Sequence, residues 1–396
     1  MGPPPLTAAP TTKDPREAPC HWHRCPCGAA MSGWARILGV TSIATGLVGA
    51  AALGGVTAQR RAVRKFRAAA DGDSAGYDAL IADRTYSVLA DDGVVLHVEE
   101  VGPENAPLTV VFGHGWTLRS GSWHFQRIGL AGQGFGTADG GPAARLVFFD
   151  QRSHGKSSRA VAGKVSMEDL AGDLAAVMAT AAPDGPVVLV GHSMGGMALI
   201  TLAELAPNLF RERVAGVGLV STAASTSAGE PISRGLLTAS SLVLRLAGVA
   251  AGRYPNLVER GRTSTRDAAW LLTRTLGFAQ KDVPGDLVDY LDEMISATPV
   301  EVITGFMPAL MSLDRSTALP VMEQIPVTVI CGDADRQTPL SRSLAIAREL
   351  PDAEMVVVEG AGHMAVMERP DAVNEALRRL FRRAADFAES KARRSG

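Results

Sequence analysis

The segment VVLVGHSMGGM, residues 187–197, joins an apolar run to a helical pattern through a Gly-rich turn. Its first four residues are typical of a buried strand, and the run that follows it to Leu205 is typical of a helix. A strand-to-helix turn this tight strains the backbone of its central residue, Ser193, and lifts the hydroxyl above the sheet. Glycines two positions away on either side, Gly191 and Gly195, let the turn close. The segment therefore predicts a nucleophilic serine at the edge of a sheet.

A serine nucleophile needs a base to accept its proton and an acid to orient that base. His363 follows the last expected strand in the segment GAGH, residues 360–363, where glycines let an imidazole reach over the sheet edge. Asp335 lies in the loop directly after the apolar run 327–331 and is the predicted acid. Asp333 is the alternative, but its position close to the strand suits an aspartate that holds the loop through backbone hydrogen bonds.

Attack by serine on a carbonyl creates an oxyanion that needs two preorganised N–H donors. The backbone amides of Met194 and Trp116 are the candidates, because Trp116 follows another expected strand in a Gly-rich turn. His114, in the same turn, is expected to support this loop, with a role as the base as the alternative. His192 adjoins the serine, so its side chain leaves the turn in another direction and is expected to be packed.

The remaining chain alternates short apolar runs with amphipathic stretches. A hairpin is expected first, with strands 86–89 and 94–99 around Asp91-Asp92-Gly93. Helices are expected at 167–182, behind a capping Ser166 and Asp169, and at 340–350. This order predicts a doubly wound α/β fold with a mostly parallel sheet. The buried strands are expected at 108–112, 146–149, 187–190, 214–220, 327–331 and 355–358.

One interval, 225–319, has helical patterns and no convincing strand. We interpret it as a helical cap inserted into a core that comprises 84–224 and 320–385, with a basic tail at 386–396; a separate helical domain is the alternative. Helices are expected at 232–248, 267–278, 286–295 and 300–312. The residues predicted to line a substrate pocket are His114, Trp270, Phe278 and Phe306.

The first 33 residues are expected to be a disordered leader, and Met31 is an alternative start to Met1. Cys20, Cys25 and Cys27 lie there with histidines between them, but their spacing matches no common zinc pattern, so metal binding is the minor alternative. No metal or organic cofactor is expected. The net charge of −2 gives no reason to propose nucleic acid as a partner, and a hydrophobic content of 46% is enough for a large core.

Residues 37–58 carry no charge and are long enough to cross a bilayer. The basic linker at 59–83 favours an anchor with the catalytic domain on the cytoplasmic side of the membrane. A cleaved signal peptide, with export, is the second possibility, since small residues stand at 56–58. A buried apolar helix in a soluble chain is the third.

Five segments together resemble the α/β-hydrolase superfamily in content and order. They are HGW at 114–116, DQRSHGKS at 150–157, GHSMG at 191–195, GDADRQTP at 332–339 and GAGH at 360–363. The resemblance covers about 84–385, is closest to the esterase, lipase and non-haem haloperoxidase-like branch with a helical cap, and implies that 150–157 shapes the floor of the site. The chain departs from the pattern at Ser153, where many relatives have glycine, and in a Gly-rich insert at 132–142.

The resemblance and the apolar cap predict a serine hydrolase that cleaves carboxylic esters with apolar acyl or alcohol groups. A serine at the turn argues against epoxide hydrolases and haloalkane dehalogenases, which use aspartate there. Acyl transfer and the cleavage of thioesters, amides or carbon–carbon bonds remain open, because the same three side chains serve all of them. A non-catalytic protein that binds a ligand in the capped pocket is a rival of another class.

Overall fold

The computed structural model describes residues 2, 63, 76–77, 82–132, 134, 143–160, 165–226 and 266–395. All of them except Gly2 belong to one compact unit that begins at Ala58. The predicted leader, the apolar segment 37–58, most of the basic linker and the three N-terminal cysteines lie outside the described residues, as do most of the insert at 132–142 and the expected helix at 232–248.

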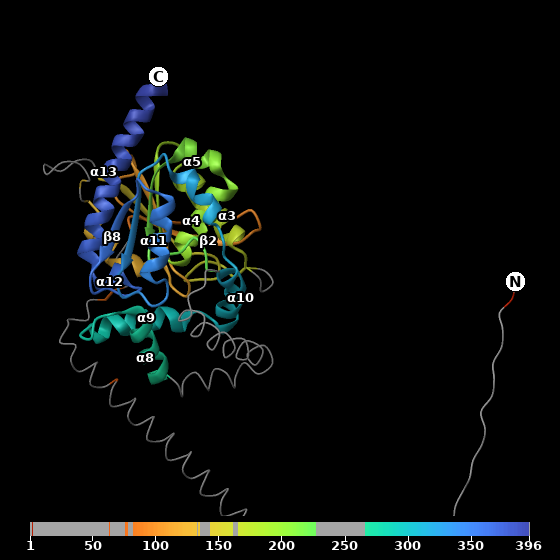
Figure 1. The fold of residues 1–396 in the computed structure, drawn as a ribbon, viewed down its shortest axis with the longest axis vertical. Helices are drawn as coiled ribbons and strands as arrows, with labels where there is room; N and C mark the ends of the chain where they lie inside the picture. Colours follow the sequence, from red (N-terminus) through yellow and green to blue (C-terminus); the bar gives the residue numbers. More distant parts are fainter. Residues whose placement is uncertain are drawn as a thin grey trace, which may run out of the picture. The chain divides into compact units, whose positions relative to one another are not determined.

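Eight strands of the described residues form one sheet, in which β1 and β2 are antiparallel and β3 to β8 are parallel where they pair (Figure 1). The prediction of a doubly wound, mostly parallel α/β fold is confirmed. The order across the sheet is β1 (Arg84–Leu89), β2 (Val95–Val101), β4 (Arg145–Phe149), β3 (Thr109–Gly113), β5 (Val187–His192), β6 (Val214–Val220), β7 (Val327–Gly332) and β8 (Glu354–Val358).

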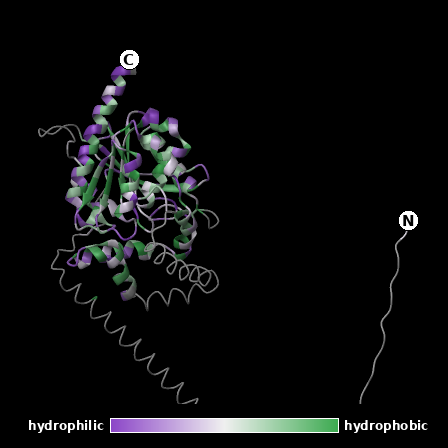
Figure 2. Ribbon diagram, viewed as in Figure 1, coloured by the Kyte–Doolittle hydropathy of each residue, from purple (hydrophilic) through white to green (hydrophobic). Residues whose placement is uncertain are grey.

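The central strands are apolar because both of their faces are covered. Every residue of β3, β5, β6 and β7 is buried, as expected for a parallel sheet between two helical layers. In β4 the alternate residues enter different cores, Leu146 and Phe148 on one face and Val147 and Phe149 on the other. Figure 2 shows the resulting apolar centre, in contrast with the hydrophilic end of the long C-terminal helix.

The two layers are built from helices that follow the strands in the chain. The first core contains residues of α2 (His124–Leu130) and α13 (Pro370–Ser395), and the second contains residues of α3 (Met167–Ala181), α4 (Met194–Leu205), α5 (Pro207–Arg213) and α11 (Leu340–Glu349). The expected cap of α3 forms: Ser166 Oγ accepts from Asp169 N, and the carboxylate of Asp169 accepts from Ser166 N.

Among the described residues, three α-helices lie between β6 and β7 in the chain: α8 (Arg266–Gly277), α9 (Gly285–Ala297) and α10 (Val300–Met311). We call them the cap helices. Figure 1 shows α8 and α9 beyond one end of the strands, on the side where the short helix α12 (Ala365–Glu368) lies. The 3-10 helices η1 (Ser120–Trp123) and η2 (Ser316–Met322) complete the described elements. The limits 225 and 319 of the insertion stay a prediction.

Within the described ranges, no individual helix has both the length and the apolar composition needed to cross a membrane. The bent pair α9 and α10 passes that test only when the two helices are taken together, with an angle of 90° between them. Seven residues of α9 and three of α10 are buried, and the core helices of globular proteins pass the same test.

Candidate active site

Ser193 lies in the turn between β5 and α4, and its backbone is strained. Its φ of 52° and ψ of −116° are unfavourable for a residue with a side chain. The neighbouring backbone is too close for other residues: a Cβ on Gly191 would overlap the Gly196 amide, and one on Gly195 would overlap the Gly113 carbonyl. The strain and these two glycines together present the serine hydroxyl at the end of the sheet.

Three side chains from loops far apart in the sequence meet at this point. Ser193 Oγ is 3.0 Å from His363 Nε2. His363 Nδ1 is 2.9 Å from Asp335 Oδ2 and 3.1 Å from Oδ1. With the proton assigned to Nδ1, the ring donates to the carboxylate and accepts from the serine hydroxyl. Asp333 is exposed, whereas Asp335 is buried against the histidine, so the structure brings Asp335 and not Asp333 to the imidazole.

The Asp335 carboxylate has enough hydrogen-bond donors to stay ionised in a buried position. Its Oδ1 accepts from the backbone N–H groups of Gln337, at 2.8 Å, and Thr338, at 2.9 Å. Burial, the largest influence, raises the pKa of Asp335, but the charge and hydrogen bond of His363 and these two N–H groups lower it by more, so it lies below its ordinary value. An anion there favours the Nδ1–H tautomer of His363.

The two predicted oxyanion-hole residues lie close to the ends of neighbouring strands: Met194 directly follows Ser193, and Trp116 follows β3. Met194 is the first residue of α4, and the first N–H groups of a helix have no partner inside it. Trp116 is half-buried in the loop after β3. The next amide, that of Thr117, donates to His154 Nε2 at 3.1 Å, and Leu118 N donates to Gly115 O. These bonds fix the loop on either side of the Trp116 amide.

His114 is fully buried and both of its ring nitrogens are in use. Nε2 accepts from Gln151 N at 2.9 Å, so Nδ1 carries the proton and donates to Gly115 O at 2.8 Å. Burial lowers the pKa of His114. These bonds support the loop of Trp116 and leave no ring nitrogen for a role as the base.

His192 has a role that sequence analysis did not identify. Its Nε2–H donates to the backbone carbonyl of His363 at 3.0 Å, and the ring is buried. Burial lowers the pKa of His192 to about 3, so the ring is neutral and keeps this proton. His192 thus holds the main chain of His363, the histidine that faces Ser193.

The segment 150–157 is held by its own side chains. Asp150 accepts from Ser120 N at 2.7 Å and from Lys156 N at 2.8 Å. Ser153 adopts a φ of 66°, in the left-handed region that favours glycine. Its hydroxyl accepts from Ala160 N at 3.0 Å, which stabilises the loop in this conformation.

The three predicted pocket residues from the cap divide between two buried clusters. Trp270 and Phe278 belong to the cluster that includes α9 and α13, and the Trp270 indole donates to Asp289. Phe306, on α10, belongs to the cluster that includes Met194, and its ring centroid is 5.0 Å from that of His154. Of the three cap residues, the structure therefore brings Phe306 into the cluster that adjoins the serine.

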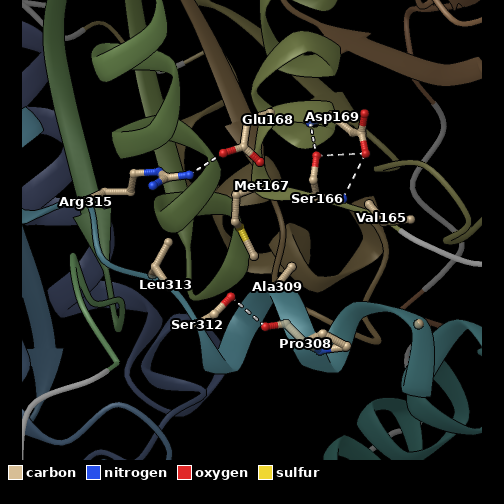
Figure 3. Close-up of a pocket in the computed structure, with 11 residues that line it drawn as sticks. Val165, Ser166, Met167, Glu168, Asp169, Pro308, Ala309, Ser312, Leu313 and Arg315 are labelled. Atoms are coloured by element: carbon tan, nitrogen blue, oxygen red, sulfur yellow. Dashed lines mark hydrogen bonds and ion pairs between the residues drawn. The ribbon is translucent and has the colours of Figure 1, made fainter. Parts of the chain in front are cut away.

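A cavity of about 470 Å³ lies between the start of α3 and the end of α10 (Figure 3). None of the predicted pocket residues lines it. Its wall includes Met167, which belongs to the same apolar cluster as Met194 and Phe306. At the rim, Arg315 pairs with Glu168, so the polar groups there are already engaged. Besides Met167, its apolar lining comes from Val165, Pro308, Ala309 and Leu313.

In the part of the chain that the structure describes, no group of three histidine, cysteine, aspartate or glutamate side chains could hold a metal ion. Cys331 is buried in β7, and burial raises the pKa of its thiol to about 12.

Comparison with known proteins identifies the family. The model of the alpha/beta hydrolase family matches residues 110–376. A 2-(acetamidomethylene)succinate hydrolase from Mesorhizobium japonicum is 26% identical over 294 residues, which cover 72% of this chain and 90% of that protein. The dihydrolipoyllysine-residue acetyltransferase component of an acetoin cleaving system from Pseudomonas putida is 26% identical over 292 residues, covering 74% of this chain and 68% of that one.

Solved structures share the fold. An esterase from Thermogutta terrifontis aligns with a TM-score of 0.60 at 24% identity, covering 76% of this chain and 99% of its own. A bromoperoxidase from Bacillus anthracis aligns with a TM-score of 0.57 at 18% identity, covering 74% and 98%. The matched residues include most of the sheet and the three hydrogen-bonded residues at its edge, Ser193, His363 and Asp335. The chain belongs to the alpha/beta hydrolase family.

Proposed function

We propose that this protein is a serine hydrolase that cleaves carboxylic esters with apolar acyl or alcohol groups through an acyl-enzyme. The observation that carries the proposal is the continuous chain of hydrogen bonds from Ser193 to His363 to Asp335, with distances of 3.0 and 2.9 Å. Both donor–acceptor distances are short enough for a proton to be transferred or a charge to be stabilised along the hydrogen bond.

The first half of the reaction forms the acyl-enzyme. Ser193 Oγ attacks the ester carbonyl while His363 Nε2 takes its proton, and the ionised Asp335 stabilises the imidazolium. The amides of Met194 and Trp116 donate to the carbonyl oxygen as it becomes negative. His363 then protonates the leaving alkoxide, the carbon–oxygen bond breaks, and the alcohol departs.

The second half returns the enzyme to its initial state. Water attacks the acyl carbonyl while His363 accepts one of its protons, and the same amides hold the second oxyanion. The proton then passes from His363 to Ser193 Oγ as the acid is released. Every proton taken up by His363 is given back, so the cycle balances without another reactant.

The preference for apolar groups rests on the surroundings of Met194. A buried cluster packs there against half-buried Trp116 and excludes water from the neighbourhood of the nucleophile; it includes Met167, Met197, Val302, Phe306 and Leu313. Among the proteins of similar sequence are one named as a hydrolase and one named as an acetyltransferase component. Acyl transfer to an alcohol and cleavage of amides, thioesters or carbon–carbon bonds are the competing activities.

The test is the reaction of the full-length protein with a fluorophosphonate probe and with p-nitrophenyl esters of increasing acyl chain length, beside Ser193→Ala. We expect labelling and turnover in the wild type, neither in the variant, and better kcat/KM for chains longer than acetate. Parallel anilides, thioesters and added alcohols would identify a competing activity. Absence of labelling and of turnover on every substrate would favour a non-catalytic, ligand-binding protein.

Membrane association through residues 37–58, with the catalytic domain in the cytoplasm, is proposed on the sequence alone. The protein is expected in the membrane fraction of cells and inaccessible to protease added outside intact cells. Release as a shortened soluble form would favour a cleaved signal peptide.

A further inference from the structure

Glu368, the last residue of α12, has a buried carboxylate that the proposed reaction does not use. It accepts three backbone N–H bonds: from Gly362 at 2.6 Å on Oε2, and from Gln280 at 2.6 Å and Ala279 at 2.9 Å on Oε1. Gly362 directly precedes His363. Ala279 and Gln280 follow the cap helix α8. One carboxylate therefore joins the histidine loop to the cap helices.

The end of α8 is joined to the same loops through its carbonyl groups. Gly277 O accepts from Met364 N at 2.8 Å. In the loop that carries Asp335, Arg336 donates to Thr275 O and the side chain of Gln337 donates to Leu276 O. The last carbonyls of a helix have no partner inside it. Here the loops of the proposed acid and base supply donors to three successive carbonyls, those of Thr275, Leu276 and Gly277.

There is no room for the histidine loop to shift toward the cap. A Cβ on Gly362 would lie 2.8 Å from Gly277 O and 2.9 Å from Ala279 N. On its other side, the loop approaches β7 so closely that a Cβ on Gly332 would overlap the Ala361 carbonyl. The loop is thus confined between β7 and the turn after α8, and Glu368 holds its N–H group to that turn.

We propose that Glu368 is a positioning residue for His363: by binding the amides of Gly362, Ala279 and Gln280 together, its carboxylate holds the imidazole within reach of Ser193 and makes its position depend on the cap helices. The inference rests on the proposed function. A carboxylate suits this role because it has two acceptor oxygens and no donor. An amide has one acceptor oxygen and would have to turn its NH₂ group toward a backbone N–H.

The consequence for catalysis follows from the sensitivity of proton transfer to distance. A displacement of about 1 Å by a change remote from the reacting atoms can cost on the order of 10²-fold in rate. Glu368 touches no reacting atom, so its loss should lower kcat and leave the binding of a small ester, and hence KM, nearly unchanged.

The experiment compares Glu368→Ala and Glu368→Gln with Glu100→Ala in the full-length protein. Glu100 is a matched control because it is also a buried glutamate, but it lies on β2 and pairs with Arg84 and Tyr86. For a short p-nitrophenyl ester, we expect Glu368→Ala to lower kcat roughly 10- to 100-fold with little change in KM. Glu368→Gln should be intermediate, and Glu100→Ala should lower the unfolding midpoint without lowering kcat.

Two further measurements separate positioning from a general loss of stability. The rate of fluorophosphonate labelling, measured well below the unfolding midpoint, should fall with kcat, because it also needs His363. The low-field proton resonance of the His363–Asp335 hydrogen bond should shift or broaden in the Glu368 variants alone. If Glu368→Ala does not fold, Glu368→Gln and this resonance carry the test.

The outcomes distinguish this inference from the proposed function. Normal kcat, labelling rate and resonance in folded Glu368 variants would overturn the inference and leave the proposed function intact. An equal loss of kcat in Glu100→Ala would also overturn it, because the effect would then be general. A wild-type protein that neither labels nor turns over any ester would overturn both.

Discussion

Ser193 and His363 face each other at 3.0 Å, but they are held in place by different means. The serine is positioned by the six residues 191–196, whose strained turn and close-packed glycines admit few alternatives. The histidine is positioned by side chains outside its own loop: His192 and Asp335, which are distant in sequence, and Glu368, which follows in α12 and joins the loop to the residues after the cap helix α8. The nucleophile therefore depends mainly on the geometry of its own turn, to which Val220 O and Thr222 Oγ1 add one hydrogen bond each. The base depends on side chains from outside its own loop.

The largest effect should come from breaking the bond that orients the base. Asp335→Asn removes the anion that selects the Nδ1–H tautomer of His363, so kcat should fall on the order of 10⁴-fold with little change in overall structure. Steady-state kinetics check this. Asp333→Asn, two residues away and exposed, is the control and should keep wild-type kcat; comparable losses in both variants would contradict the assignment of the acid.

The next largest effect should be on the free energy of unfolding, when the turn that positions Ser193 is disturbed. In Gly195→Ala the new methyl group overlaps the Gly113 carbonyl, so the free energy of unfolding should decrease by about 3 kcal/mol. Gly172→Ala is the matched control, because Gly172 is an exposed glycine in α3 with open space around it. It should stabilise the protein by roughly 0.5–1 kcal/mol. Urea unfolding of both variants measures these changes. A Gly195→Ala protein as stable as the wild type would show that the turn has room for a methyl group.

A smaller effect should follow from removing the bond between the two histidines. His192→Leu leaves the His363 carbonyl buried without its donor. The main chain of His363 is then held less firmly, so kcat should fall about tenfold. His192→Gln can return an N–H to the same place and should retain most of the activity. Equal activity of the leucine and wild-type proteins would mean that His363 is held without this bond.

The buried histidines should also make folding sensitive to acid. Burial lowers the pKa values of His154 and His192 to about 3, below the ordinary value of 6.5. Between these values the unfolded chain binds more protons than the folded one, so the free energy of unfolding should decrease as pH falls from about 6.5 toward 3, by several kcal/mol in total. The lowered pKa of Asp335 acts in the same direction at still lower pH.

Urea titrations at pH 7, 5.5 and 4.5 measure this slope. His192→Gln, which cannot be protonated, should have a flatter dependence than the wild type, although its stability at pH 7 is similar or lower. A slope that does not change in the variant would show that His192 is not buried neutral in solution.

The same contrast explains how much could be predicted. Strand patterns, the turn at Ser193 and the loops of Asp335 and His363 are signals within short segments, and the cap helices coincide closely with their expected ranges, even though Pro308 lies inside α10. Glu368 carries no comparable signal, because its partners are backbone groups at 279, 280 and 362. The cavity between α3 and α10 was missed for a related reason: its walls come from segments more than 100 residues apart.

Trapping the covalent intermediate tests the role of Ser193 as the nucleophile. The full-length protein is mixed with a p-nitrophenyl ester and quenched in acid during the first turnovers, and its peptides are analysed by mass spectrometry. We expect one acyl group per chain, attached to Ser193, and none in Ser193→Ala. Turnover that persists in Ser193→Ala, or an acyl group attached to another residue, would contradict it.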